Sequence, residues 1–224
     1  MKLVNFCLDL IFPKRCICGM WDTVLCPNCI KKIACNKTQT CPICKKISKN
    51  GKVCSTCRPK TTLTGVMIFG EHEGILKKLI WRYKYEFIRD LSEPLASLVC
   101  TKFGSFLSSK RFLITFVPIS KRRLRFRGYN QSELLARDIA AKLNLAEKAL
   151  LKRTGRGKPQ VGLTRAERIR NLKNQIQAFD TDISNKKVLV VDDVYTSGTT
   201  LDECAKVLRE KGYKEIWGLV LSRD

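Results

Sequence analysis

The sequence predicts an α/β fold in which a parallel sheet is covered by helices on both faces. Beyond residue 60, short runs of β-branched and aliphatic residues alternate with longer stretches of helical apolar spacing, and this order favours parallel strands joined by helices. Before residue 60, the chain holds ten of its 12 cysteines. We therefore expect an N-terminal helix and a small cysteine-rich module over residues 1–60 and an α/β domain over residues 61–224, since 224 residues suffice for both.

The elements of the α/β domain can be read in chain order. The expected strands are short apolar runs, typical of strands buried on both faces, at residues 66–69, 112–117, 188–191 and 215–221. The expected helices repeat apolar residues every three or four positions, and Pro94 suits the first turn of the second helix. They span residues 74–85, 94–107, 132–143, 165–173 and 201–211. In such a sheet, loops at the carboxyl ends of the strands form the ligand crevice.

Two adjacent acids and a hydroxyl-rich loop follow the strand at 188–191. Asp192 and Asp193 are suited to accept hydrogen bonds from sugar hydroxyls or to hold a divalent cation. The loop that follows precedes a helix, whose N-terminus offers backbone N–H groups to a phosphate. The Walker A and dinucleotide-binding spacings are absent. The pattern therefore predicts a site for a phosphorylated sugar, and the alternative is an ordinary strand-to-helix turn with a Ser/Thr cap.

This segment resembles the signature of type I phosphoribosyltransferases, which bind 5-phosphoribosyl-1-pyrophosphate (PRPP) with Mg²⁺. The resemblance implies that Asp192 and Asp193 are the catalytic residues and hold the ribose hydroxyls, that the following loop cradles the 5-phosphate, and that a turn beginning at Ser120 meets the pyrophosphate. The residues implied to bind PRPP are Ser120, Lys121, Arg122, Asp192, Asp193, Thr196, Ser197, Gly198, Thr199 and Thr200. A basic loop with two glycines is expected to act as a flexible lid and contains Arg153, Lys158 and Gln160.

Eight of the N-terminal cysteines fall into closely spaced pairs, and two such pairs can close one tetrahedral Zn²⁺ site. We expect two structural Zn²⁺ ions, the first held by Cys16, Cys18, Cys26 and Cys29 and the second by Cys41, Cys44, Cys54 and Cys57. The first set contains a one-residue gap, which leaves Cys35 open as a substitute ligand. A disulfide framework is the alternative, but it requires an oxidising compartment. About 60 residues bury little core, so metal binding would supply much of this module's folding free energy.

The chain is strongly basic, with 43 Lys and Arg against 20 Asp and Glu and a formal net charge of +23. Residues 121–180 hold 16 basic and 5 acidic residues, whereas residues 181–224 hold 7 and 8. Such an excess favours a polyanionic partner, most simply nucleic acid, although lysine-rich faces also serve solubility. Trp81, Tyr83 and Tyr85 alternate with basic residues, a pattern that fits base stacking or an ordinary core helix.

Neither a secretory signal nor a transmembrane segment is expected from the sequence. We therefore expect a cytoplasmic protein, for which association with a membrane through partners stays open.

Taken as a whole, the chain resembles the ComF family, the competence-associated relatives of phosphoribosyltransferases. The matching segments are Phe12-Pro13, residues 122–131, residues 158–160 with Arg168 and Asn171, residues 192–200 and residues 221–223. The resemblance implies a type I phosphoribosyltransferase fold with an N-terminal zinc-ribbon module, PRPP binding with Mg²⁺, and the handling of single-stranded DNA during uptake. A helicase that the zinc module recruits is a further expected partner. Cys16-x-Cys18 departs from the family's usual Cys-x-x-Cys.

An alternative interpretation is an active phosphoribosyltransferase of nucleotide metabolism or salvage that releases pyrophosphate. The two interpretations differ in whether a chemical acceptor exists. From the length and content of the sequence we do not expect a complete amidophosphoribosyltransferase, because no segment resembles a glutaminase domain. The sequence leaves open the identity of the acceptor and the oligomeric state.

Overall fold

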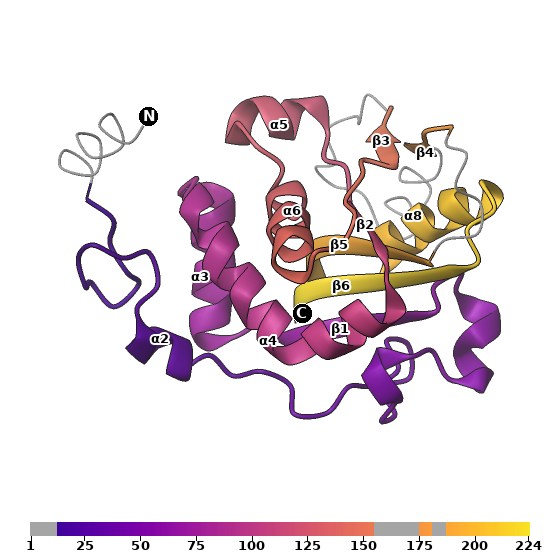
Figure 1. Ribbon diagram of the computed structural model, residues 1–224, viewed down its shortest axis with the longest axis horizontal. Helices are drawn as coiled ribbons and strands as arrows, with labels where there is room; N and C mark the ends of the chain where they lie inside the picture. The colour runs from indigo at the N-terminus through magenta and orange to yellow at the C-terminus, as the bar shows by residue number, and fades with distance from the viewer. Residues whose placement is uncertain (1–12, 155–174, 181–186) are drawn as a thin grey trace, which may run out of the picture.

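The computed structural model describes residues 13–154, 175–180 and 187–224. Its centre is a sheet of four parallel strands in the order β1-β6-β5-β2 (Figure 1). These are β1 (Gly65–Glu71), β6 (Glu215–Arg223), β5 (Lys187–Tyr195) and β2 (Leu113–Phe116). All four predicted strands are confirmed, and β5 and β6 extend further than their apolar runs. They extend because Asp192 and Tyr195 of β5 still pair with Val220 and Arg223 of β6.

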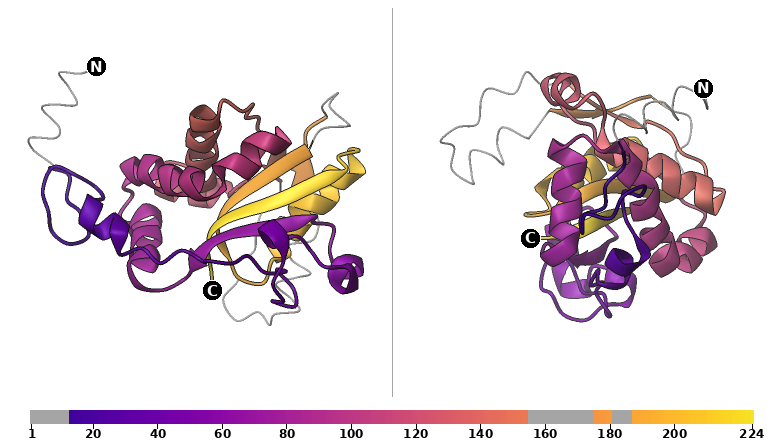
Figure 2. Two further views of the ribbon diagram at one scale, coloured as in Figure 1. Left: turned by 60° about the horizontal axis from the view of Figure 1, so that its bottom comes forward. Right: turned by 90° about the vertical axis from the view of Figure 1, so that its left-hand side faces the viewer.

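Helices cover both faces of this sheet (Figures 1 and 2). One face packs against α3 (Gly74–Tyr85), α4 (Ser92–Lys110) and α6 (Gln131–Leu143), and the other packs against α8 (Thr199–Glu210). Between α3 and α4 lies the short 3-10 turn η3 (Arg89–Leu91). The predicted helix at 165–173 lies outside the described residues. Over those residues, no helix combines the length and the apolar content that crossing a membrane would require.

Side chains of the central strand alternate between the two faces. Leu189 and Val191 pack with α3, α4 and α6, whereas Val188 and Val190 pack with α8, and all four are fully buried. Successive side chains of a strand point to opposite faces, so a strand covered on both sides must be apolar throughout. Each such side chain contributes about 1.5–3 kcal/mol through burial, and together they hold the carboxyl end of β5 in place.

Two parts of the structure differ from the sequence prediction. Residues 121–127, expected as a basic turn, form the helix α5 (Lys121–Arg127), which Ser120 caps and Gly128 ends with a positive φ of 73°. None of the residues of α5 is buried. The helix therefore has no apolar face, and the sequence shows no helical repeat of apolar residues from which to predict it. Residues with no predicted element form a two-stranded antiparallel ribbon of β3 (Leu151–Arg153) and β4 (Ile176–Ala178). Such short strands carry too few residues for a recognisable alternation.

The N-terminal residues run along the free edge of β1 (Figure 2). They include α2 (Pro27–Lys31), η1 (Lys49–Gly51) and η2 (Ser55–Lys60). Gln39 bonds twice to the backbone of Ile68, at 2.9 Å each, and the amide of Asn36 donates to the carbonyl of Phe69 at 2.8 Å. These bonds occupy backbone groups of the edge strand β1, which would otherwise be free to pair with a strand of another chain. The domain boundary at residue 60 stays a prediction.

Candidate functional site

The two acids lie near the carboxyl end of the central strand β5, each held by a different helix. The Ser132 hydroxyl on α6 donates to Asp192 at 3.0 Å, and the backbone amide of Asp193 donates to the same carboxylate at 2.9 Å. On α3, Lys84 forms an ion pair with Asp193 at 2.7 Å, and both side chains are less than a fifth exposed. The two carboxylates are therefore fixed in position before any ligand arrives.

The environment changes the protonation of Asp192. Burial, followed by repulsion from the neighbouring Asp193, raises the pKa of Asp192 to about 7, against an ordinary value of 3.8. The charge of Lys84 and the hydroxyl of Ser132 act in the opposite direction. Near neutral pH, the acid pair can therefore gain or lose a proton when a cation or a sugar hydroxyl binds.

A hydroxyl-rich loop follows these acids and leads into α8. Gly198 caps the helix with a positive φ of 74°, and a Cβ atom there would lie 2.3 Å from the Tyr195 hydroxyl oxygen. Only glycine fits this position, because both the backbone angle and the space exclude a side chain. The hydroxyls of Ser197 and Thr199 lie 2.8 Å apart. The loop thus combines hydroxyl groups with the N-terminus of a 12-residue helix, an arrangement that attracts anions.

The turn after β2 lies at the same end of the sheet. Strands β2 and β5 are parallel neighbours, and the amide of Val117 donates to the carbonyl of Val191 at 3.0 Å, one residue before Asp192. Asn130 fixes the turn by donating to the carbonyl of Val117 at 3.0 Å. Three predicted pyrophosphate-binding residues follow this strand and are held by the start of α5, namely Ser120, Lys121 and Arg122.

Of the three predicted lid residues, only Arg153 is described. It ends β3 and donates to the Gln175 side chain at 2.8 and 3.3 Å. Burial and the positive charge of Arg123 lower the pKa of Arg153. Lys158 and Gln160 lie outside the described residues.

Lys84 is a site residue that sequence reasoning missed. It resembles the other lysines on the basic face of the helix, and only the packing of α3 on the sheet brings it to Asp193. A single lysine on an amphipathic helix carries no local signal of such a role.

The predicted cysteine sets form two separate groups. In each group the four sulfur atoms lie within 4.8 Å of one another, and Cys35 belongs to neither. Burial raises the pKa of the Cys16 thiol, but hydrogen bonds from the backbone amides of Cys18 and Cys26 lower it, and the pKa is about 7. Four thiols with amide donors around them match the ligand chemistry of structural Zn²⁺. Both groups could therefore hold a metal ion.

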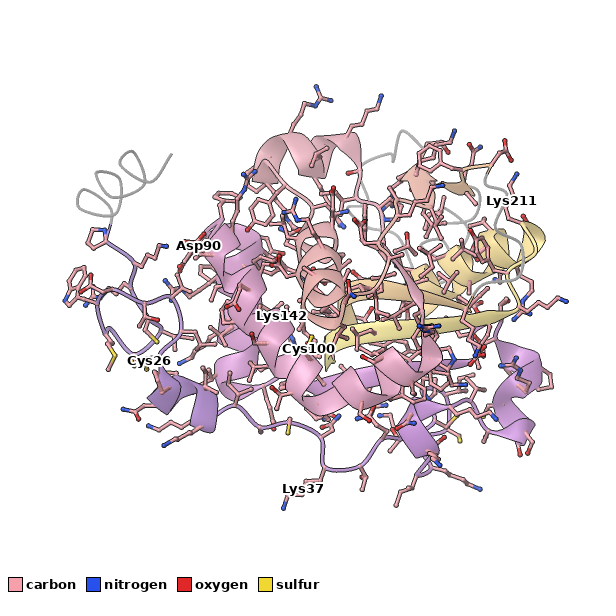
Figure 3. All side chains as sticks on the ribbon, viewed as in Figure 1. Cys26, Lys37, Asp90, Cys100, Lys142 and Lys211 are labelled. Atoms are coloured by element: carbon pink, nitrogen blue, oxygen red, sulfur yellow. The ribbon has the colours of Figure 1, made fainter. Side chains whose placement is uncertain are left out.

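The two groups lie at different places, the first beside α3 and the second beside the start of β1. The first is next to α2, where Figure 3 labels Cys26, and Cys100 on α4 is part of neither group. A hydrogen bond connects this first group to α3, since the Arg82 guanidinium donates to the carbonyl of Arg15 at 3.0 Å. The second group adjoins the start of β1, where the amide of Val53 donates to the carbonyl of Thr64 at 3.0 Å.

Comparison with known proteins matches residues 130–222 to the model of the phosphoribosyl transferase domain. Competence protein F of Haemophilus influenzae is 30% identical over 212 residues, which cover 87% of this chain and 89% of that protein. Competence protein ComFC of Bacillus subtilis is 24% identical over 85% of this chain and 80% of its own length. DNA utilization protein YhgH of Escherichia coli is 26% identical over 90% and 91%, respectively.

Proposed function

Because this chain belongs to the ComF family, we propose that it binds PRPP with Mg²⁺ and acts in DNA uptake, where it handles single-stranded DNA. The observation that carries the PRPP part is the position of Asp192 and Asp193 beside the Gly198 loop at one end of the sheet. The DNA part is supported by the names of the relatives and by the basic excess of the chain.

Each part of PRPP would meet a different group of this site. Asp192 and Asp193 would hold the ribose hydroxyls and the Mg²⁺ ion, which neutralises phosphate charge. The loop of residues 196–200 would receive the 5-phosphate on its amides and hydroxyls. Ser120, Lys121 and Arg122 would meet the pyrophosphate. Lys84 would have to give up its ion pair with Asp193 or share it with the ligand.

Calorimetric titration of PRPP with Mg²⁺ into the full chain tests this site. Wild-type protein should bind, and the double variant Asp192→Asn, Asp193→Asn should lose binding while its circular dichroism stays unchanged. Retained binding by the double variant would refute the assignment. Asp138→Asn is a matched control, because it removes an acid from α6 and leaves both site carboxylates in place.

The second candidate is an active phosphoribosyltransferase, favoured by the cavity that Lys84 lines next to the acid pair. An acceptor would bring its nitrogen to the anomeric carbon, the bond to pyrophosphate would break, and the nitrogen would lose its proton. Release of pyrophosphate should be measured across nucleobases, ammonia and single-stranded DNA. If pyrophosphate release requires one of these acceptors and vanishes in the double variant, the protein is an enzyme. If PRPP binds but no acceptor causes pyrophosphate release, PRPP acts as a regulator.

A further inference from the structure

Exposed aromatic side chains extend from α3, where one of them is next to Lys84 in the chain, to α5. Trp81, Tyr85, Phe87 and Phe126 are 53%, 49%, 42% and 68% exposed. The core takes the opposite face of α3, where Tyr83 is fully buried and donates to the carbonyl of Gln131 at 2.9 Å. Of the three aromatic residues that the sequence suggested for base stacking, Tyr83 is thus excluded, because it is a core residue.

Ring contacts join these side chains into one surface. Trp81 and Tyr85 lie 5.9 Å apart between ring centroids, and Phe87 and Phe126 lie 5.5 Å apart. The guanidinium of Arg127, which follows Phe126 on α5, lies 5.3 Å from the centroid of the Tyr85 ring and brings α5 to the first pair. Exposed rings this close together cost free energy in water, so a surface of this kind indicates a ligand.

The surroundings of the rings are cationic. Trp81 and Tyr85 line a cavity of about 860 Å³ between α3 and the first cysteine group. Among the described residues that line it, the charged ones are mainly basic, and the one acid, Glu86, is paired with Arg82 at 2.7 Å. The basic residues lining it are Arg15, Lys77, Lys78, Arg82 and Lys84. A ligand that presents aromatic faces and carries regular negative charge fits both properties, and single-stranded nucleic acid is such a ligand.

Lys84 connects this surface to the sugar site, because the same side chain lines the cavity and pairs with Asp193. A base stacked on Tyr85 would therefore lie next to the place where PRPP is proposed to bind.

We propose that Trp81, Tyr85 and Phe126 form a stacking surface for the unpaired bases of a single strand, which passes beside the acid pair. This inference rests on the proposed handling of single-stranded DNA and assigns it a place. It distinguishes stacking on rings from the general attraction of phosphates to lysines, which any basic surface provides.

The test compares two labelled strands of equal length, one of thymidylates and one without bases, by fluorescence anisotropy with the full-length protein. Trp81→Ala, Tyr85→Ala and Phe126→Ala should each weaken binding of the thymidylate strand about tenfold, since each removes a ring on which one base stacks. Binding of the abasic strand should stay unchanged. Phe179→Ala is the matched control, because that ring is 41% exposed, also has a lysine over it, and lies outside the surface.

Equal loss for both strands, no loss for either, or no binding of the thymidylate strand by the wild type would overturn the inference. Titration of PRPP into the same variants separates this result from failure of the sugar site, because none of the three rings belongs to that site.

Discussion

Lys84 on α3 and Asp193 on β5 form an ion pair of 2.7 Å that joins two elements far apart in the chain. Both side chains are more than four-fifths buried, so solvent screens their attraction less than that of a surface pair. The pair links the proposed sugar site to the cavity beside α3. It also supplies positive charge next to two carboxylates that would otherwise repel each other.

Replacement of Lys84 should shift the pH range in which the site works. The positive charge of Lys84 lowers the pKa of Asp192, so Lys84→Met should raise that pKa further. The pH midpoint of PRPP binding in the presence of Mg²⁺ should then move up by about one unit. Calorimetric titrations over a pH series measure this midpoint. Lys84→Arg keeps the charge and should leave the midpoint in place, and an unmoved midpoint in Lys84→Met would contradict the electrostatic role.

Asp192 should make the folded protein less stable as the pH rises. Its pKa is about 7 when folded and near the ordinary 3.8 when unfolded, so the folded state binds more protons between these values. The free energy of unfolding therefore decreases as pH rises through this window. Asp192→Asn keeps an acceptor oxygen for Ser132 and should remove that decrease, which makes it roughly 1–3 kcal/mol more stable than wild type near pH 8.

Urea unfolding at about pH 5 and about pH 8 checks the sign. Parallel changes in wild type and Asp192→Asn between the two conditions would show that Asp192 does not titrate in this range.

Loss of one thiol from the second cysteine group should remove one metal ion. Cys54→Ser leaves three sulfur ligands, so the zinc content should fall by about one ion per chain and the N-terminal residues should become more sensitive to protease. Plasma emission spectrometry on the purified chain measures the zinc. Cys100→Ser is the control, because Cys100 lies on α4 outside both groups. An unchanged zinc content in Cys54→Ser would refute the second site.

A side chain at Gly51 should detach the second cysteine group from the sheet. Gly51 has a φ of +77°, and a Cβ atom there would lie 2.0 Å from the carbonyl oxygen of Val66 in β1. Gly51→Ala should therefore lower the free energy of unfolding by about 2 kcal/mol or more. Gly74→Ala is a matched control, since Gly74 also has a positive φ but has nothing within 4 Å of the added carbon. Equal losses in urea unfolding would mean that backbone strain alone, without the contact, sets the cost.

The candidate site was partly predictable because some of its parts are local in sequence. A strand, two acids and a hydroxyl-rich loop before a helix can be recognised in one stretch, and the structure has them in that order in β5 and α8. The two cysteine groups were predictable for the same reason, since four thiols at short spacings can meet only in tight turns. Amphipathic α3 has the predicted bounds, Gly74–Tyr85, because its buried face repeats at helical spacing.

By itself, the sequence determined the fold class, the order of the strands along the chain and the residues of the acid loop, because apolar periodicity and short motifs act over neighbouring residues. Only the tertiary structure decided that Lys84 meets Asp193, that Tyr83 is core while Trp81 and Tyr85 stay exposed, and that one cysteine group lies beside α3 and the other beside β1. These outcomes depend on how helices pack on the sheet, and packing joins residues whose separation in the chain carries no local pattern.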